Sequence, residues 1–136
     1  MPIVHQKKWY TREQIRAERH RVFVFGDNLA RRGLGGQAKA ARGEPNAVGI
    51  ATKRAPTMGP NEFFTDSDED FAMVKAVWKE DFDPIIQALK EGKDVVFPAD
   101  GIGTGLAQLP QRAPDLALLL GTMIRMLELT YGSRTE

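Results

Sequence analysis

Two glycine-rich stretches are the parts of the sequence best suited to chemistry. "GDNLARRGLGG", residues 26–36, and "ADGIGTG", residues 99–105, each follow a short apolar, β-branched run. Glycine lets backbone N–H groups approach a ligand closely, and clustered N–H donors suit a phosphate or diphosphate. Neither stretch has the G-x-x-x-x-G-K-[ST] or G-x-G-x-x-G spacing of the established phosphate-binding loops. For either loop alone a plain turn explains the glycines equally well, but two such loops after two strands favour a nucleotide-like ligand.

Few ionisable side chains lie near these loops in the sequence. Lys53 ends the stretch "NAVGIATK", and a lysine becomes a nucleophile only where burial or a nearby cation, such as its neighbour Arg54, lowers its pKa. The other interpretation is a solvated lysine at a strand end. Asp27 and Asp100 are weak acid–base candidates, because an aspartate in such a loop more often caps a turn or orients a hydroxyl. Thr104 is either a phosphate donor or a turn residue.

Composition excludes several other kinds of site. The chain has no cysteine, and its two histidines, His5 and His20, have no acid or metal ligand at a useful spacing, so we expect surface histidines and no metal. A net charge of +1 lacks the bulk charge of a nucleic-acid-coating protein, although a local basic patch stays open. No apolar run approaches the ~18 residues of a membrane span and no signal-peptide core is present, so we expect a cytoplasmic protein without a membrane partner.

Strands and helices alternate along the chain. We expect strands at 21–25, 46–52 and 92–98. We also expect a helix after Thr11, an Ala-rich helix of about two turns after the first glycine loop, a helix over 68–91 that starts at Thr65 or Ser67 and is broken before Pro84, and a long helix from Pro114 followed by a frayed tail. This alternation predicts the α/β class, with one domain over residues 1–136, three α/β/α layers and a mixed sheet. Ligands of such sheets bind at the carboxyl ends of the strands, so we expect both glycine loops to line one pocket.

These motifs, in this order, resemble those of the macrodomains, which bind ADP-ribose. Asn28 followed by "GLGG" and "QAKAAR" is similar to the first macrodomain loop, and "VVFPADGIGTGL" is similar to the second. "GIATKRA" looks like the strand-end segment of the branch that contains the terminal ADP-ribose glycohydrolase and the antitoxin that removes ADP-ribose from DNA. The resemblance spans residues 21–129 and implies a macrodomain-like fold.

The resemblance also implies a role for individual residues. Asn28 would contact the distal ribose, the second loop would wrap the diphosphate, and Lys53 would be the amine that acts at the anomeric carbon. Two features depart from the family: Ala107 stands where the glycohydrolase branch has an acid, and no G-D-[IV] segment is present to hold adenine, so Trp9 or Tyr10 would have to stack on the base. The expected ligand-binding residues are Gly26, Asp27, Asn28, Gly33, Gly35, Gly36, Gly101, Ile102, Gly103, Thr104, Gly105 and Leu106.

Three functions follow as hypotheses. The first is a protein that binds ADP-ribose or a related NAD-derived nucleotide as a reader or sequestering protein, without a cofactor; it is favoured because Ala107 cannot transfer a proton. The alternative is a glycohydrolase that removes ADP-ribose from protein or nucleic acid through Lys53, with Asp27 or Asp100 as its acid–base partner. The second alternative is a non-macrodomain α/β nucleotide-processing protein, such as the lysine-decarboxylase-like phosphoribohydrolases. All three place a nucleotide against the glycine loops.

Overall fold

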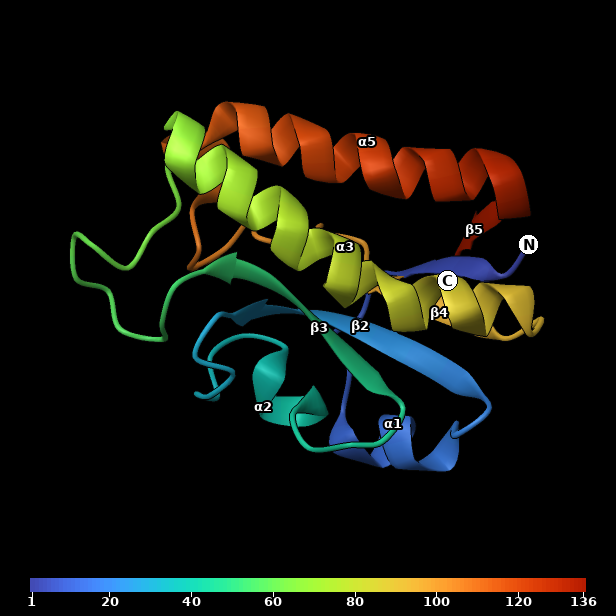
Figure 1. The fold of residues 1–136 in the computed structure, drawn as a ribbon. Coiled ribbons are helices and arrows are strands. Elements are labelled where there is room, and N and C mark those ends of the chain that lie inside the picture. The colour runs from blue at the N-terminus through green and yellow to red at the C-terminus, as the bar shows by residue number, and fades with distance from the viewer.

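The computed structural model describes all 136 residues as strands and helices that alternate around one sheet (Figure 1). The expected cap residues begin two of the helices: Thr11 accepts a hydrogen bond from the N–H of Gln14, and Ser67 accepts one from the N–H of Asp70. In chain order the elements are β1 (Ile3–Gln6), α1 (Arg12–Ala17), β2 (Arg21–Asn28), α2 (Ala38–Ala41), β3 (Ala47–Lys53), α3 (Asp68–Lys90), β4 (Asp94–Pro98), α4 (Leu109–Arg112), α5 (Pro114–Tyr131) and β5 (Ser133–Thr135).

The five strands form one parallel sheet in the order β3-β2-β4-β1-β5. The α/β class is confirmed, but the expectation of a mixed sheet is wrong. Every connection between successive strands contains at least one helix, and such crossovers return the chain to the same end of the sheet, so all strands run in one direction. The carboxyl ends of all five strands therefore lie at the same edge of the sheet.

Helices cover both faces of the sheet. Figure 1 shows α3 and α5 on one face and α1 and α2 on the other. Side chains alternate between these two layers along each strand: Val95 and Phe97 of β4 pack in the cluster under α3 and α5, whereas Val96 packs in the cluster under α1 and α2. The largest side chain in the cluster under α3 and α5 is that of Trp78, on α3. The largest in the cluster under α1 and α2 is that of Tyr10, in the loop before α1.

Two helices differ in length from the sequence-based expectation. The helix after the first glycine loop, α2, has only four residues rather than two turns, because Gly43 and Pro45 follow it closely. The helix α3 continues through Pro84 for 23 residues, so the expected break is absent. Pro84 is exposed, and the buried side chains Phe82 and Ile85 on either side of it keep the helix packed on the sheet.

Both ends of the chain hold strands that the sequence did not indicate. The N-terminal β1 lies between β4 and β5, and the expected frayed tail is wrong because β5 pairs with β1. Ion pairs hold this tail: Arg134 lies 2.8 Å from Asp94. His5 on β1 also has a partner contrary to expectation, since its Nε2 lies 3.3 Å from Oε1 of Glu128 on α5. Residues this far apart in sequence meet only in the folded sheet.

None of the helices combines the length and the apolar character that a membrane-spanning segment needs.

Candidate functional site

A pocket of about 580 Å³ lies at the carboxyl edge of the sheet, in the size range of small-molecule sites. The strand order explains its place: β2 and β4 are neighbours, but the chain leaves β2 toward β3 and leaves β4 toward β5, and a crevice opens where two such connections part. The pocket is lined by Trp9, Gly26, Asp27, Asn28, Arg32, Gly33, Gly35, Gly36, Gln37, Ala38, Arg42, Thr52, Lys53, Pro56, Pro98, Asp100, Gly101, Gly103, Thr104, Gly105, Leu106 and Ala107.

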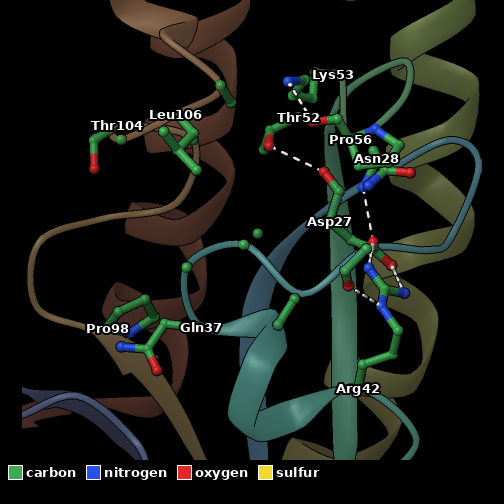
Figure 2. A pocket seen from close by; sticks show the side chains of 18 of the residues that line it. Asp27, Asn28, Gln37, Arg42, Thr52, Lys53, Pro56, Pro98, Thr104 and Leu106 are labelled. Carbon is green, nitrogen blue, oxygen red and sulfur yellow. Dashed lines mark hydrogen bonds and ion pairs between the residues drawn. The ribbon is translucent and has the colours of Figure 1, made fainter. Parts of the chain in front are cut away.

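The two glycine loops both line this pocket. Figure 2 shows Thr104 and Leu106 of the second loop on the opposite side of the pocket from Asp27, Asn28 and Lys53. Of the expected ligand-binding residues, only Ile102 is absent from the lining. Its side chain is buried in the core cluster beneath the second loop, because the apolar group anchors the loop while the glycines around it stay at the surface.

The backbone N–H groups of these loops are largely unpaired. None of the N–H groups of residues 32–37 or of residues 102–107 donates a hydrogen bond to a backbone carbonyl of the chain. Backbone N–H groups in folded proteins nearly always have a partner, in the protein or in solvent or a ligand. All residues of these two runs except Leu34 and Ile102 line the pocket, and free donors grouped in this way form a site suited to an anion with several oxygen atoms.

Helix N-termini add little to this site. The helices that follow the loops, α2 and α4, have four residues each, so their dipoles are small. The N-terminus of the long helix α5 is already occupied, since the carboxylate of Asp66 accepts hydrogen bonds from the N–H groups of Asp115 and Leu116 at 2.9 and 3.1 Å. The loop N–H groups themselves are therefore the main anion-binding feature, rather than a helix N-terminus behind them.

Two of the glycines are required where the loops pack against β3 and its following loop. Gly33 has φ 97°, and a Cβ built there would lie 2.7 Å from Cβ of Pro56. Gly103 has φ 80°, and a Cβ there would lie 3.1 Å from Cγ2 of Thr52 and 3.2 Å from Cβ of Leu109. A side chain at either position would be strained as well as crowded, so these residues fix the loops in place.

An arginine clamp orients the first loop. Arg42 binds the carboxylate of Asp27 at 2.5 Å and donates to the carbonyl oxygens of Gly33 and Arg32 at 2.7 and 3.2 Å (Figure 2). Asn28 Nδ2 donates to the same Arg32 carbonyl at 2.8 Å. In a trans peptide the N–H points away from the C=O. Because the Arg32 and Gly33 carbonyls face Arg42, the N–H groups of the same two peptides, those of Gly33 and Leu34, point away from the clamp. The clamp had no signal in the sequence, because Asp27 and Arg42 belong to no recognisable motif.

Asn28 also carries an unsatisfied oxygen. Its Oδ1 is the one buried side-chain nitrogen or oxygen in the chain without a hydrogen-bond partner. Leaving a buried acceptor unpaired costs about 1–3 kcal/mol, so such an atom beside a pocket is a candidate for a ligand hydroxyl.

Lys53 lies in the pocket wall and is buried, so a solvated strand-end lysine is the wrong interpretation. Its Nζ donates to the Thr57 carbonyl at 2.8 Å and lies 4.9 Å from the centre of the Phe63 ring. Burial lowers the pKa of Lys53, the nearby carboxylate of Glu62 opposes this, and the charge of Arg112 lowers it further. The expected cation was Arg54, but its guanidinium is paired with Asp70 instead.

The acids near Lys53 are not arranged as its catalytic partner. Asp27 is buried and ion-paired with Arg42 and Arg31, which makes it a structural residue of the clamp. Asp100 is exposed at the pocket, and its carbonyl accepts the hydroxyl of Thr104 at 2.8 Å, so Thr104 closes a turn. Ala107, at the position where the macrodomain resemblance implies an acid, also lines the pocket. No group of three or more His, Cys, Asp or Glu side chains is placed to hold a metal ion.

Gln37 lies at the end of the pocket away from Lys53 (Figure 2). Trp9 lines the pocket near Gln37, because the next residue in the chain, Tyr10, donates its N–H to the Gln37 side chain. Trp9 is 61 % exposed, whereas Tyr10 is buried and donates its hydroxyl to the Val24 and Val96 carbonyls, so Tyr10 cannot stack on a ligand. The Gln37 Oε1 accepts the N–H of Tyr10 at 3.1 Å, which leaves its Nε2 free to donate. This end offers one aromatic face and one amide donor.

Comparison with known protein families assigns the chain to one family, whose function is unknown. A family profile described as a family of unknown function, DUF7831, matches residues 5–123, which include every element from α1 to α4 and both loops of the site. The chain belongs to this family. Among curated proteins and among solved structures, nothing matches the chain.

Proposed function

We propose that this member of DUF7831 is a macrodomain-like protein that binds ADP-ribose or a related NAD-derived nucleotide as a reader or sequestering protein. The observation that carries the proposal is the pair of N–H runs at residues 32–37 and 102–107, which have no backbone acceptor and most of whose residues line one pocket. A diphosphate between two sugars fits such a site, because its oxygen atoms can accept from both loops and its ends extend to both ends of the pocket.

The proposal orients the ligand. The distal ribose lies toward Asn28, whose unpaired Oδ1 accepts a ribose hydroxyl after a small adjustment of the first loop. The base lies toward Trp9 and Gln37, by stacking and by one hydrogen bond from Nε2. No free carboxylate lines that end to accept the adenine amino group except the exposed Asp100, so adenine is held mainly by its face.

A second candidate function is hydrolysis of an ADP-ribosyl linkage on protein or nucleic acid. The observation that favours it is the buried amine of Lys53 in the pocket wall, with its lowered pKa. Two observations oppose hydrolysis: the Lys53 amine already donates a hydrogen bond to a backbone carbonyl, and no acid is placed beside this amine. General acid–base help is worth roughly 10²–10⁴-fold in rate, so the chain as it stands is better suited to binding than to turnover.

Titration calorimetry of the protein with ADP-ribose, NAD, AMP and cyclic ADP-ribose tests the proposal. We expect ADP-ribose to bind with a micromolar or lower Kd and AMP to bind at least about tenfold more weakly, because AMP lacks the second phosphate and the distal ribose. AMP binding as tightly as ADP-ribose would place the recognition at the base and contradict the role given to the loops. No heat with any of the four would contradict the proposed ligand class.

A further inference from the structure

The N-terminal 54 residues and the rest of the chain carry opposite net charge. Residues 1–54 hold twelve of the 19 Lys and Arg residues but only four of the 18 Asp and Glu residues, and the rest of the chain has the opposite excess. Residues 1–54 supply α1 and α2, and the remaining residues supply α3 and α5, so the helical layers on the two sheet faces differ in the sign of their net charge. An asymmetry of this size indicates a polyanionic partner on the basic layer.

A second, smaller groove of about 290 Å³ lies on that basic layer. It shares Trp9, Gly36 and Gln37 with the main pocket, so the groove starts where the base end of the pocket stops. Its remaining walls come from the start of α1 and from α2, and they include Arg12 and Lys39.

The charge along this groove is not neutralised by the chain. Three arginines of the layer, Arg12, Arg16 and Arg19, share the single carboxylate of Glu44. The exposed side chain of Lys39, in the groove, and that of Arg32, at the pocket, have no carboxylate within ion-pair distance, since neither takes part in any of the chain's salt bridges. The groove thus brings the free cation of Lys39 and the shared charge of Arg12 beside one exposed aromatic ring, with the free Arg32 at the adjoining pocket.

We infer that this groove binds a single-stranded nucleic acid that continues from the base-bearing nucleotide in the main pocket, an inference that rests on the proposed function. Cations that follow a backbone, with an aromatic face on which a base stacks, are the features that bind single strands. The groove leaves the pocket at the end away from Lys53, so the strand continues from the sugar hydroxyl of the base-bearing nucleoside. The ligand class is a strand whose 5′ end carries a diphosphate-ribose.

The test compares four probes by fluorescence anisotropy or competition at about 50 mM and about 200 mM salt. The probes are free ADP-ribose, a single-stranded RNA of about ten nucleotides whose 5′ adenosine carries a diphosphate-ribose and so forms an ADP-ribose end, the same RNA with a 5′ hydroxyl, and a poly-glutamate peptide. The variant is Lys39→Glu, because Lys39 lines the groove and not the main pocket. The matched control is Lys79→Glu, an exposed lysine of α3 in the other layer.

We expect the capped RNA to bind at least ~10-fold more tightly than free ADP-ribose at the lower salt concentration, with the gain lost in Lys39→Glu and kept in Lys79→Glu. Binding of free ADP-ribose should change by less than about twofold in both variants.

If ADP-ribose binds but the strand adds nothing, or adds a gain that Lys39→Glu does not remove, the groove inference is wrong and the proposed function stands. If ADP-ribose does not bind but the uncapped RNA does so through Lys39, the proposed function fails while the groove remains a nucleic-acid site. Poly-glutamate that displaces RNA as well as unlabelled RNA does would assign the groove to an acidic peptide, and no RNA binding at all would overturn the inference.

Discussion

Gly105 is the position at which a single charge tests the diphosphate site most cleanly. Gly103 is less suitable, because its positive φ and its contacts with Thr52 and Leu109 mean that a side chain there would also disturb the loop. Gly105 has no positive φ, and no atom lies within 4 Å of a Cβ built on it. We therefore compare Gly105→Glu with Gly105→Gln, which has nearly the same size and lacks the charge.

The expected effect follows from Coulomb's law. Two unit charges 4 Å apart interact by about 1 kcal/mol in bulk water and by about 4 kcal/mol at the effective dielectric constant of ~20 found near a protein surface. Gly105 is exposed, so we expect a value toward the lower limit, roughly 1.4–2.8 kcal/mol, which corresponds to about 10–100-fold weaker binding of ADP-ribose. The difference between Glu and Gln should shrink as salt rises, because the screening length falls from about 10 Å at 0.1 M to about 3 Å at 1 M.

The assay is titration calorimetry of both variants with ADP-ribose, with thermal unfolding as the control for the fold. Both variants should unfold within a few degrees of the wild type, since the new side chain points into open space. A Gly105→Glu protein that is folded and binds ADP-ribose as tightly as the Gln variant would refute the placement of the diphosphate against the second loop.

Three other changes probe the clamp, the core and the missing acid. Arg42→Gln should lower the free energy of unfolding by about 1–3 kcal/mol and weaken ADP-ribose binding, and Arg42→Lys should restore part of both. Urea unfolding measures the stability and calorimetry measures the binding. Unchanged binding would contradict the role of Arg42 in orienting the first loop. Burial raises the pKa of Tyr10 well above its ordinary 10.0, so the stability that its protonated hydroxyl contributes is complete below pH 10 and is lost as the pH rises above 10. The free energy of unfolding should therefore fall above pH 10 for the wild type and stay flatter for Tyr10→Phe. Parallel curves for the two proteins would show that another group titrates. Ala107→Asp should raise any release of ADP-ribose from a modified protein or oligonucleotide, and Lys53→Met should abolish the gain; an ordinary enzymatic rate of about 1 per second or more in the wild type would contradict the binding role.

The features that the sequence predicted well are local ones. Apolar β-branched runs indicated β2, β3 and β4, and the glycines that end two of these runs indicated the loops that the structure places around one pocket. Residues within one turn predicted a helix start at Thr11 and another at Thr65 or Ser67, and the second helix begins at Ser67. Such signals depend on neighbours in the chain and need no knowledge of the tertiary fold.

The features that the sequence did not predict depend on contacts between distant residues. β1 and β5 are short and become strands only because each has a neighbour in the sheet. The clamp of Arg42 on Asp27 joins residues that belong to different elements, and the unbroken α3 reflects packing that outweighs the local effect of Pro84. The division of charge between the helical layers was present in the sequence, but a total of +1 conceals it until the elements are assigned to faces.

The free N–H groups of the two loops are the central feature of the proposed site, and a nitrogen–proton correlation spectrum recorded during an ADP-ribose titration observes those groups one by one. We expect the largest shifts on the amides of residues 32–37 and 102–107, from both loops together and at the same ligand concentration. Shifts confined to one loop, or centred on residues outside the pocket, would contradict the claim that the two loops hold the diphosphate between them.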